Sequence, residues 1–227
     1  MAKITAVPAA ALALVLLAAP AAFAAFTVTV VPASSWGAPD AELGLDGAVV
    51  EDFEDLDLAP GLLVELGTIQ DTFAGDLLDA LPATFDPAVD DLYGDAFVIG
   101  VWDGVNVFFN TPGNATVDYG FTEFRRVQLH VPGGTAWFGL SLQQLTGNEG
   151  LIVNGRSLGR VAGLGLAPTS GRNGYLIVSS DDPAEPILSV AVGGGGDAFV
   201  IDHVAFASPG QVPIETAGWS AVKALYR

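Results

Sequence analysis

Short segments rich in β-branched and aromatic residues follow one another along this chain, and glycine, asparagine, aspartate or proline separates them. Closely spaced strands with turn residues between them are typical of antiparallel sandwiches. The pattern therefore predicts an all-β fold, a jelly-roll-like antiparallel β-sandwich. The expected strands cover residues 27–31, 48–53, 62–66, 97–102, 105–109, 125–131, 135–142, 151–153, 175–179, 187–192 and 198–206.

Two dipeptides in this pattern are signals for tight hairpin turns. Asp103-Gly104 lies between the expected strands 97–102 and 105–109, and Asn154-Gly155 follows the expected strand 151–153. Aspartate, asparagine and glycine tolerate the positive φ angles that two-residue hairpin loops require. Both dipeptides therefore predict β-hairpins.

Helices are expected in only two places. Within residues 71–95, Phe73, Leu77 and Leu81 recur at helical spacing before Pro82, which predicts about two helical turns. Thr216 could cap a last helix near the end of the sequence. Elsewhere turns are expected between strands. In the strand that begins at Arg125, Val127, Leu129 and Val131 should share one face, and Pro132-Gly133-Gly134 predicts the end of that strand.

Residues 1–24 have the composition of a secretory signal peptide. Lys3 supplies a positive start, an apolar run extends from Ile4 to Ala19, and Ala22-Phe23-Ala24 is a small-x-small cleavage site. The apolar run is too short and too rich in alanine to favour a spanning helix. We therefore expect a secreted or cell-surface protein without a transmembrane anchor in its mature chain. Its sandwich domain would cover 25–207, followed by a linker and C-terminal tail over 208–227.

The charge of the chain is strongly negative and unevenly distributed. No lysine or arginine occurs between Lys3 and Arg125, although most of the 26 acidic residues lie there, and the formal net charge is −18. Nucleic acids and anionic lipids are bound through lysine and arginine, so they are not expected as partners. The absence of cysteine means that core packing, a metal, or both must stabilise an exported fold.

Four segments are similar to motifs of a known group of proteins. Val50-Glu51-Asp52-Phe53-Glu54-Asp55-Leu56 resembles the opening FE-D/G-L strand of many exported bacterial β-sandwich proteins, and Leu151-Ile152-Val153-Asn154-Gly155 resembles their central V-N-G hairpin. Tyr175-Leu176-Ile177-Val178-Ser179 resembles a strand that often reads F-F-G-I/V. The segment from Gly196 to Phe206 resembles their closing D-G-F-x-I-D-D/N-V-x-F strand. Proteins of this kind are common among those with a PEP-CTERM surface-sorting tail, and the resemblance implies a jelly roll whose opening and closing strands are neighbours.

The end of the chain departs from that group. A PEP-CTERM tail needs a membrane-spanning run, but only a short segment follows Pro213-Ile214-Glu215. The ending is similar to short W-G-x-I/V-K-x-L/M-Y-R tails of other exported bacterial proteins. This resemblance implies an address label that sorting machinery would recognise through Trp219, Lys223, Tyr226 and Arg227. The alternative is an amphipathic terminus that docks loosely on the sandwich.

Calcium is the cofactor that the resemblance suggests. In jelly-roll binding modules a structural Ca²⁺ often joins an acid near the opening strand to one on the closing strand, which here implies Asp52, Glu54 and Asp202. Carboxylate oxygens suit this hard cation. Because alternate residues share a face, Asp52 and Glu54 should point outward when Phe53 points inward, unless the strand bulges. The alternative is a solvated acidic edge that discourages pairing between sheets.

Candidate catalytic residues are few. Gly155-Arg156-Ser157-Leu158-Gly159 matches the G-x-S-x-G pattern of hydrolases, but glycine-rich sequence follows it where a helix would be needed, so we interpret it as part of a hairpin. The two histidines, His130 and His203, each lie opposite the apolar face of their strand. With Asp202 they could form a metal site, but no third ligand stands out, so we expect both to be ordinary surface positions.

The function that these patterns favour is binding rather than catalysis. Trp36, Trp102 and Trp137 could stack on sugar rings, and Trp102, beside the Asp103-Gly104 turn, should be half exposed. Each could instead belong to the core. We therefore expect an exported, non-catalytic module that binds glycan or cell-surface matrix through Trp102 and Trp137. The alternatives are an exported hydrolase using Ser157 or the acids near Glu54, and a purely structural surface protein.

Overall fold

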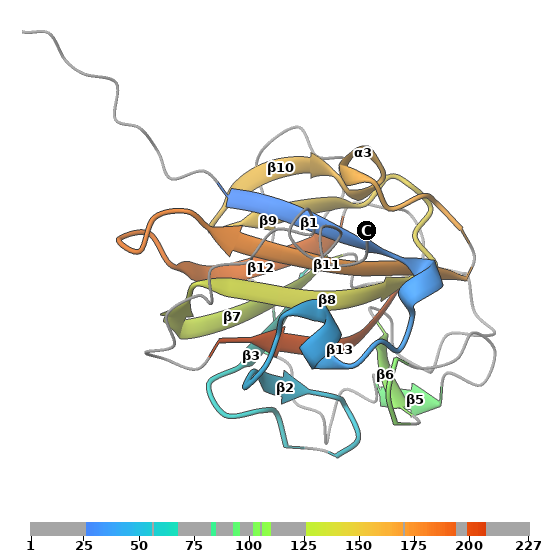
Figure 1. Ribbon diagram of the computed structural model, residues 1–227, viewed down its shortest axis with the longest axis horizontal. Coiled ribbons are helices and arrows are strands. Elements are labelled where there is room, and N and C mark those ends of the chain that lie inside the picture. The colour runs from blue at the N-terminus through green and yellow to red at the C-terminus, as the bar shows by residue number, and fades with distance from the viewer. Residues whose placement is uncertain are drawn as a thin grey trace, which may run out of the picture.

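The computed structural model describes residues 26–55, 57–67, 83–84, 93–95, 102–104, 106–109, 126–169, 171–193 and 199–207. These residues form two antiparallel β-sheets that pack face to face, so the predicted all-β sandwich is confirmed (Figure 1). The predicted signal peptide and the predicted C-terminal tail lie outside the described residues.

Sheet A contains the first and last described strands of the chain. Its order is β1 (Phe26–Pro32), β11 (Arg172–Ser180), β8 (Trp137–Gln143), β13 (Val200–Phe206), β6 (Asn106–Phe109) and β5 (Tyr93–Asp95), and β2 (Val49–Glu51) also pairs with β13. Glu51 faces Val204 and Val49 faces Phe206 in the antiparallel register. The expectation that the opening and closing strands are neighbours is therefore confirmed.

Sheet B covers the other side of the core. Its order is β10 (Arg156–Arg160), β9 (Gly150–Val153), β12 (Ile187–Gly193), β7 (Arg126–Thr135), β3 (Leu63–Gly67) and β4 (Ala83–Thr84). Alternate residues of each strand point into the space between the sheets, as in Val127, Leu129 and Val131 of β7. These side chains meet Phe138 and Leu140 from β8, so the alternation of Val127, Leu129 and Val131 in the sequence correctly identified the buried face of β7.

The two predicted hairpins have different outcomes in the structure. Asn154 and Gly155 both have positive φ angles, 50° and 76°, and connect β9 to its neighbour β10, as expected. At the other site only Gly104 has a positive φ, 61°. The expected first arm, 97–102, lies outside the described residues except for Trp102, and β6 pairs with β5 and β13.

Two expectations from the sequence are wrong, one about where helices occur and one about where a strand ends. Helices occur outside the expected places: η1 (Ala33–Ser35), α1 (Asp40–Leu43) and α3 (Val161–Leu164). Pro132-Gly133-Gly134 does not end β7, which continues to Thr135 with an irregular register against β12. The irregularity accommodates residues that a regular strand excludes. Most of 71–95 lies outside the described residues, which in that stretch form only β4 and β5.

None of the helices in the described part of the chain has the length and apolar character needed to span a membrane. The helices there are single turns that connect strands. One of them, α1, belongs to the segment between β1 and β2, which lies in front of β8 and β13 in Figure 1. This segment positions the candidate site.

Candidate functional site

A second apolar cluster lies on the outer face of sheet A, away from the core between the sheets. We call it the outer cluster: Leu45, Trp102, Tyr175 and Ala205 are buried in it, and Trp36, Leu43, Trp137 and Ile177 are among the partly buried residues packed against it. Leu176 and Val178 of β11 point into the main core, so Tyr175 and Ile177 point the opposite way. Residues 36–48, which we call the covering segment, close over this face.

A bulge in β13 places two polar residues under the outer cluster. The pairing of β13 with β8 shifts between Asp202 and Ala205, and His203 has a φ of 43°. The carboxylate of Asp202 accepts hydrogen bonds from the backbone N–H of His203 at 2.8 Å and from the backbone N–H of Trp102. The Ser141 hydroxyl donates to the Asp202 carbonyl at 2.7 Å. Asp202 therefore ties Trp102 to the bulged strand.

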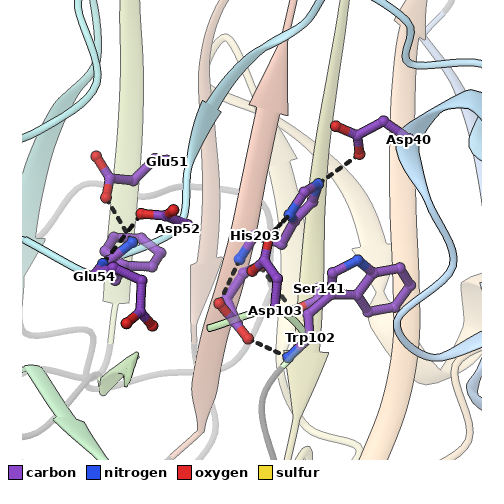
Figure 2. Close-up of polar contacts among 10 residues, drawn as sticks. Asp40, Glu51, Asp52, Glu54, Trp102, Asp103, Ser141 and His203 are labelled. Carbon is purple, nitrogen blue, oxygen red and sulfur yellow. Dashed lines mark hydrogen bonds and ion pairs between the residues drawn. The ribbon is translucent and has the colours of Figure 1, made fainter. Parts of the chain in front are cut away.

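The imidazole of His203 lies between two aspartates that are distant in sequence. Its Nδ1 is 2.6 Å from Oδ2 of Asp103, and its Nε2 is 2.7 Å from Oδ1 of Asp40 at the start of α1. The ring is only 6 % exposed, with Trp102 and Tyr175 beside it. We call Asp40, His203 and Asp103 the His203 clamp, because they join the covering segment to residues 102–104 across β13 (Figure 2).

Burial and neighbouring charges set the proton affinities in this cluster. Burial raises the pKa of Asp202 to about 7, although the N–H groups of Trp102 and His203 partly offset it. Burial alone would lower the pKa of His203, but Asp103 and Asp40 outweigh it and the pKa is raised. Both groups therefore hold protons more tightly in the folded protein than in the unfolded chain.

The stability of the protein should fall as the pH rises, which is the first expected result. For both Asp202 and His203 the folded pKa is above the unfolded value, so their contribution is full below the unfolded pKa and is lost as the pH passes through the folded one. The Asp202 carboxyl, moving from 3.8 to about 7, should account for roughly 4 kcal/mol at about 1.4 kcal/mol per unit of pKa. Urea unfolding measured in steps from acid to alkaline pH would show the decline.

Matched variants separate this effect from the general negative charge of the chain. Asp202→Asn should lower stability most in acid, where the wild type has its protonated carboxyl, and should flatten the pH dependence, because the titrating carboxyl is gone. Asp181→Asn should keep the wild-type slope, since that carboxylate is exposed and accepts a hydrogen bond from the Thr27 hydroxyl at the surface. Equal slopes in the wild type and Asp202→Asn would contradict the assignment.

Tyr175 is the most unusual group of the outer cluster. Its side chain is fully buried, and its hydroxyl has no hydrogen-bond partner among the residues that the structure describes. Burial raises its pKa well above the usual value, and Asp40, Asp103 and Asp202 raise it further. The ring lies across Gly139 of β8, where a Cβ would come within 2.6 Å of the hydroxyl oxygen. A residue without a side chain is therefore needed at position 139.

The tryptophans predicted to bind ligand occupy different environments. Trp102 is 6 % exposed, so the expected half exposure is wrong. It packs edge-on against Trp36 with ring centroids 4.9 Å apart, and at the same separation from Tyr175. Trp102 is buried by tertiary packing, because the covering segment packs over this residue, which would otherwise be solvated beside its turn. Trp137 is half-buried at the margin of the outer cluster.

The acids predicted to bind calcium have separate roles. β2 ends at Glu51, and Phe53, buried with a φ of 58°, turns the chain. Asp52 is exposed and its carboxylate accepts the N–H of Glu54 at 3.1 Å, while Glu54 lies against Gly104. Asp202 is engaged by two backbone N–H groups, so we assign it to holding Trp102 and the bulge.

No group of three or more acidic or histidine side chains suited to a metal occurs among the residues that the structure describes. A bound Ca²⁺ remains a prediction from the resemblance. Glu51, which the sequence analysis did not single out, is instead a buried structural acid. Its two carboxylate oxygens accept the N–H groups of Phe53 at 2.8 Å and Ala59 at 2.6 Å, and burial raises its pKa.

The candidate nucleophile lies in a hairpin, as interpreted from the sequence. Ser157 is on β10, and its hydroxyl oxygen accepts the N–H of Gly159 at 3.3 Å. The two histidines do not share a site. His130 contacts Glu65 at 2.6 Å on sheet B, whereas the expected surface position of His203 is wrong, because the covering segment buries it.

Sequence reasoning missed Asp40, Asp103, Ser141 and Tyr175. Asp40 and His203 are separated by 163 positions, so no local motif joins them. Comparisons with protein-family models, with curated proteins and with solved structures found no match to this chain.

Proposed function

We propose that this protein is an exported, non-catalytic β-sandwich module that binds glycan or cell-surface matrix. The observation that supports a non-catalytic role is the use of the reactive side chains of the outer cluster in internal contacts. Both ring nitrogens of His203 face aspartates, and the Asp202 carboxylate and the Ser141 hydroxyl bond the backbone. A general base needs a free nitrogen or oxygen within reach of a substrate proton.

Among the three tryptophans that the structure describes, Trp137 is the indole best suited to contact a sugar ring. Trp102 is buried, and the guanidinium of Arg172 lies over the Trp36 ring at 5.5 Å from its centroid. Trp137 stands on β8 at the margin of the outer cluster with part of its surface in solvent. Aromatic side chains with one buried and one wet side are favoured in binding surfaces.

Replacing Trp137 with alanine should weaken glycan binding strongly while leaving the sandwich folded, which is the second expected result. Binding would be measured on a glycan array and folding by circular dichroism and thermal melting. Removing a central aromatic contact costs about 2 kcal/mol or more of binding energy, which is a loss of affinity of about thirtyfold. Leu63→Ala is the matched control, because Leu63 is a large apolar residue, 50 % exposed, on sheet B.

Three outcomes would count against the proposal. Equal glycan binding by Trp137→Ala and the wild type would remove Trp137 from the site. A wild-type protein that binds no glycan but assembles into large particles in light scattering would favour the structural alternative. Hydrolysis of a glycan or ester substrate that Ser157→Ala abolishes would favour the hydrolase.

A further inference from the structure

β1 is an open edge of sheet A. It stands at one end of the strand order, and among the residues that the structure describes it pairs with β11 alone (Figure 1). The N–H of Ser180 donates to the Ala136 carbonyl at 2.9 Å, on the side away from β1, so Phe26, which faces Ser180, makes no backbone bond to β11. Alternate residues of an antiparallel strand direct their N–H and C=O groups to the same side. The backbone groups of Phe26, Val28 and Val30 therefore face the open side of β1.

The other terminal strands of the two sheets are short or protected. β4 has two residues and β5 has three. β10, the end strand of sheet B, carries Arg156 and Arg160, and its pairing with β9 shifts between Ser157 and Gly159. Charges and bulges of this kind discourage the pairing of one edge with another. β1 has neither, because its seven residues carry no charge and its register with β11 is unbroken.

The side chains of β1 are also suited to a further strand. Phe26, Val28 and Val30 pack against the main core but are only partly buried, and Thr27 and Thr29 are exposed on the opposite, outer face. A strand added at this edge would cover apolar surface of the three inward side chains, which is favourable. β-branched residues such as these are common in strands.

We propose that β1 pairs with β1 of a second copy of this chain, antiparallel and about a two-fold axis at Val28. In this register Val28 bonds the partner's Val28, Phe26 bonds the partner's Val30, and Thr27 lies opposite the partner's Thr29. All three outward residues then find backbone partners. A shift by two residues would set Phe26 against Pro32, which has no N–H to donate.

The charges at the two ends of β1 favour an antiparallel copy. At the first end, the Asp181 carboxylate accepts from the Thr27 hydroxyl, while Arg156 and Glu185 form a pair without net charge. At the other end, Arg172 begins β11. The two-fold arrangement brings the acidic end of each copy to the basic end of the other, whereas a parallel arrangement would bring like charges together.

The pairing would give the two copies one continuous outer face. Trp137, Ser179 and Thr27 lie in one row across β8, β11 and β1, and the row continues into the second copy. Five strand spacings of about 4.8 Å then separate the two Trp137 residues, which is roughly 24 Å on the same face. Two sites at this separation would raise the affinity for a polymeric ligand that reaches both. The pairing itself does not depend on the proposed glycan.

Sedimentation equilibrium tests the pairing, which is the third expected result. One strand pair is smaller than a standard interface of about 1,600 Å², so we expect a dimer with a Kd of roughly 10 to 100 μM. Thr27→Lys with Thr29→Lys sets like charges opposite each other across the axis and should weaken the dimer about tenfold. Thr27→Lys with Thr29→Glu sets opposite charges there and should restore it.

A matched pair of substitutions on the other sheet is the control. Leu63→Lys with Leu188→Lys adds the same charge on sheet B, where the two leucines are 50 % and 46 % exposed, and should leave the dimer unchanged. Circular dichroism would check that each variant is folded. A wild type that stays monomeric well above the expected Kd would overturn the proposal. So would a dimer lost in the sheet B control, or a lysine–glutamate variant as weak as the double-lysine one.

Hydrogen exchange in the wild type tests the same contact without any substitution. The amides of Val28 and Val30 face the open side of β1, so their exchange should slow about tenfold or more as the protein is concentrated through the Kd. The amides of Thr29 and Val31 face β11 and should be protected at every concentration. If the exchange of Val28 and Val30 did not depend on concentration, no second copy would pair with this edge.

Discussion

Asp202→Ala is expected to lower the free energy of unfolding by about 4 kcal/mol, because it leaves two buried N–H groups without an acceptor. These groups belong to Trp102 and His203, and the carboxylate that serves them is itself fully buried. The melting temperature should fall by roughly 10 °C for a domain of this size. Urea unfolding at pH 5 to 6 is the measurement of choice.

The pH dependence of this loss is informative. Burial penalises the charged form of Asp202, so the cost of removing the side chain should shrink as the pH rises from 3.8, the ordinary pKa of the carboxyl, through its raised pKa of about 7. Asp181→Ala is the control, and a change within about 0.5 kcal/mol is expected for this exposed aspartate. A loss for Asp202→Ala as small as that of the control would mean that the bulge does not depend on the carboxylate.

Gly139→Ala is expected to be nearly as damaging, at about 3 kcal/mol, the upper end for an overpacked core. A Cβ at this position would lie 2.6 Å from both the ring edge and the hydroxyl of Tyr175. The ring cannot move aside, because it is fully buried and packed against Trp102. Thermal and urea unfolding would measure the loss, and the near-ultraviolet circular dichroism of the aromatic rings should change with it.

Gly163→Ala is a matched control for this substitution. Nothing lies within 4 Å of the Cβ that it would add, and alanine favours the short helix α3, so stability should stay the same or rise slightly. Combining Gly139→Ala with Tyr175→Leu should cost less than the sum of the two single changes, since the shorter side chain removes the clash. Strict additivity would show that the ring is not the obstacle.

The sandwich could be predicted because its strands carry their own signals. The alternation of Val127, Leu129 and Val131 indicated a face, and Asn154-Gly155 indicated a turn, since both depend on neighbours in sequence. Sequence also indicated that the opening and closing strands would be neighbours. It failed at Pro132-Gly133-Gly134, where pairing with β12 keeps an irregular strand extended beyond residues that usually end one.

The candidate site was mostly beyond sequence reasoning, for a physical reason. Residues that are polar or lie next to a turn are expected in water, and Trp102 and His203 meet that description. Both are buried because residues 36–48 cover one face of a sheet that would otherwise be wet. The covering segment has no periodic pattern of its own, since α1 is a single turn without a buried residue. Only the adjacent pair Asp202-His203 hinted at a polar site.

The pairing of β1 with β11 has a consequence for how the molecule is assembled. Phe26 pairs with Ser180 and Pro32 with Gly174, so the first described strand meets a partner from the last third of the chain. Such distant contacts close long loops before they gain any stabilising energy, which makes the folding of β-sandwiches slow. Each sheet contains a strand from the C-terminal part of the chain, β13 in sheet A and β12 in sheet B, so neither sheet can form completely from the N-terminal part alone. The N-terminal strands β1 and β2 therefore remain unpaired until their C-terminal partners have been synthesised. The chain is therefore suited to remaining unfolded until most of its length is available.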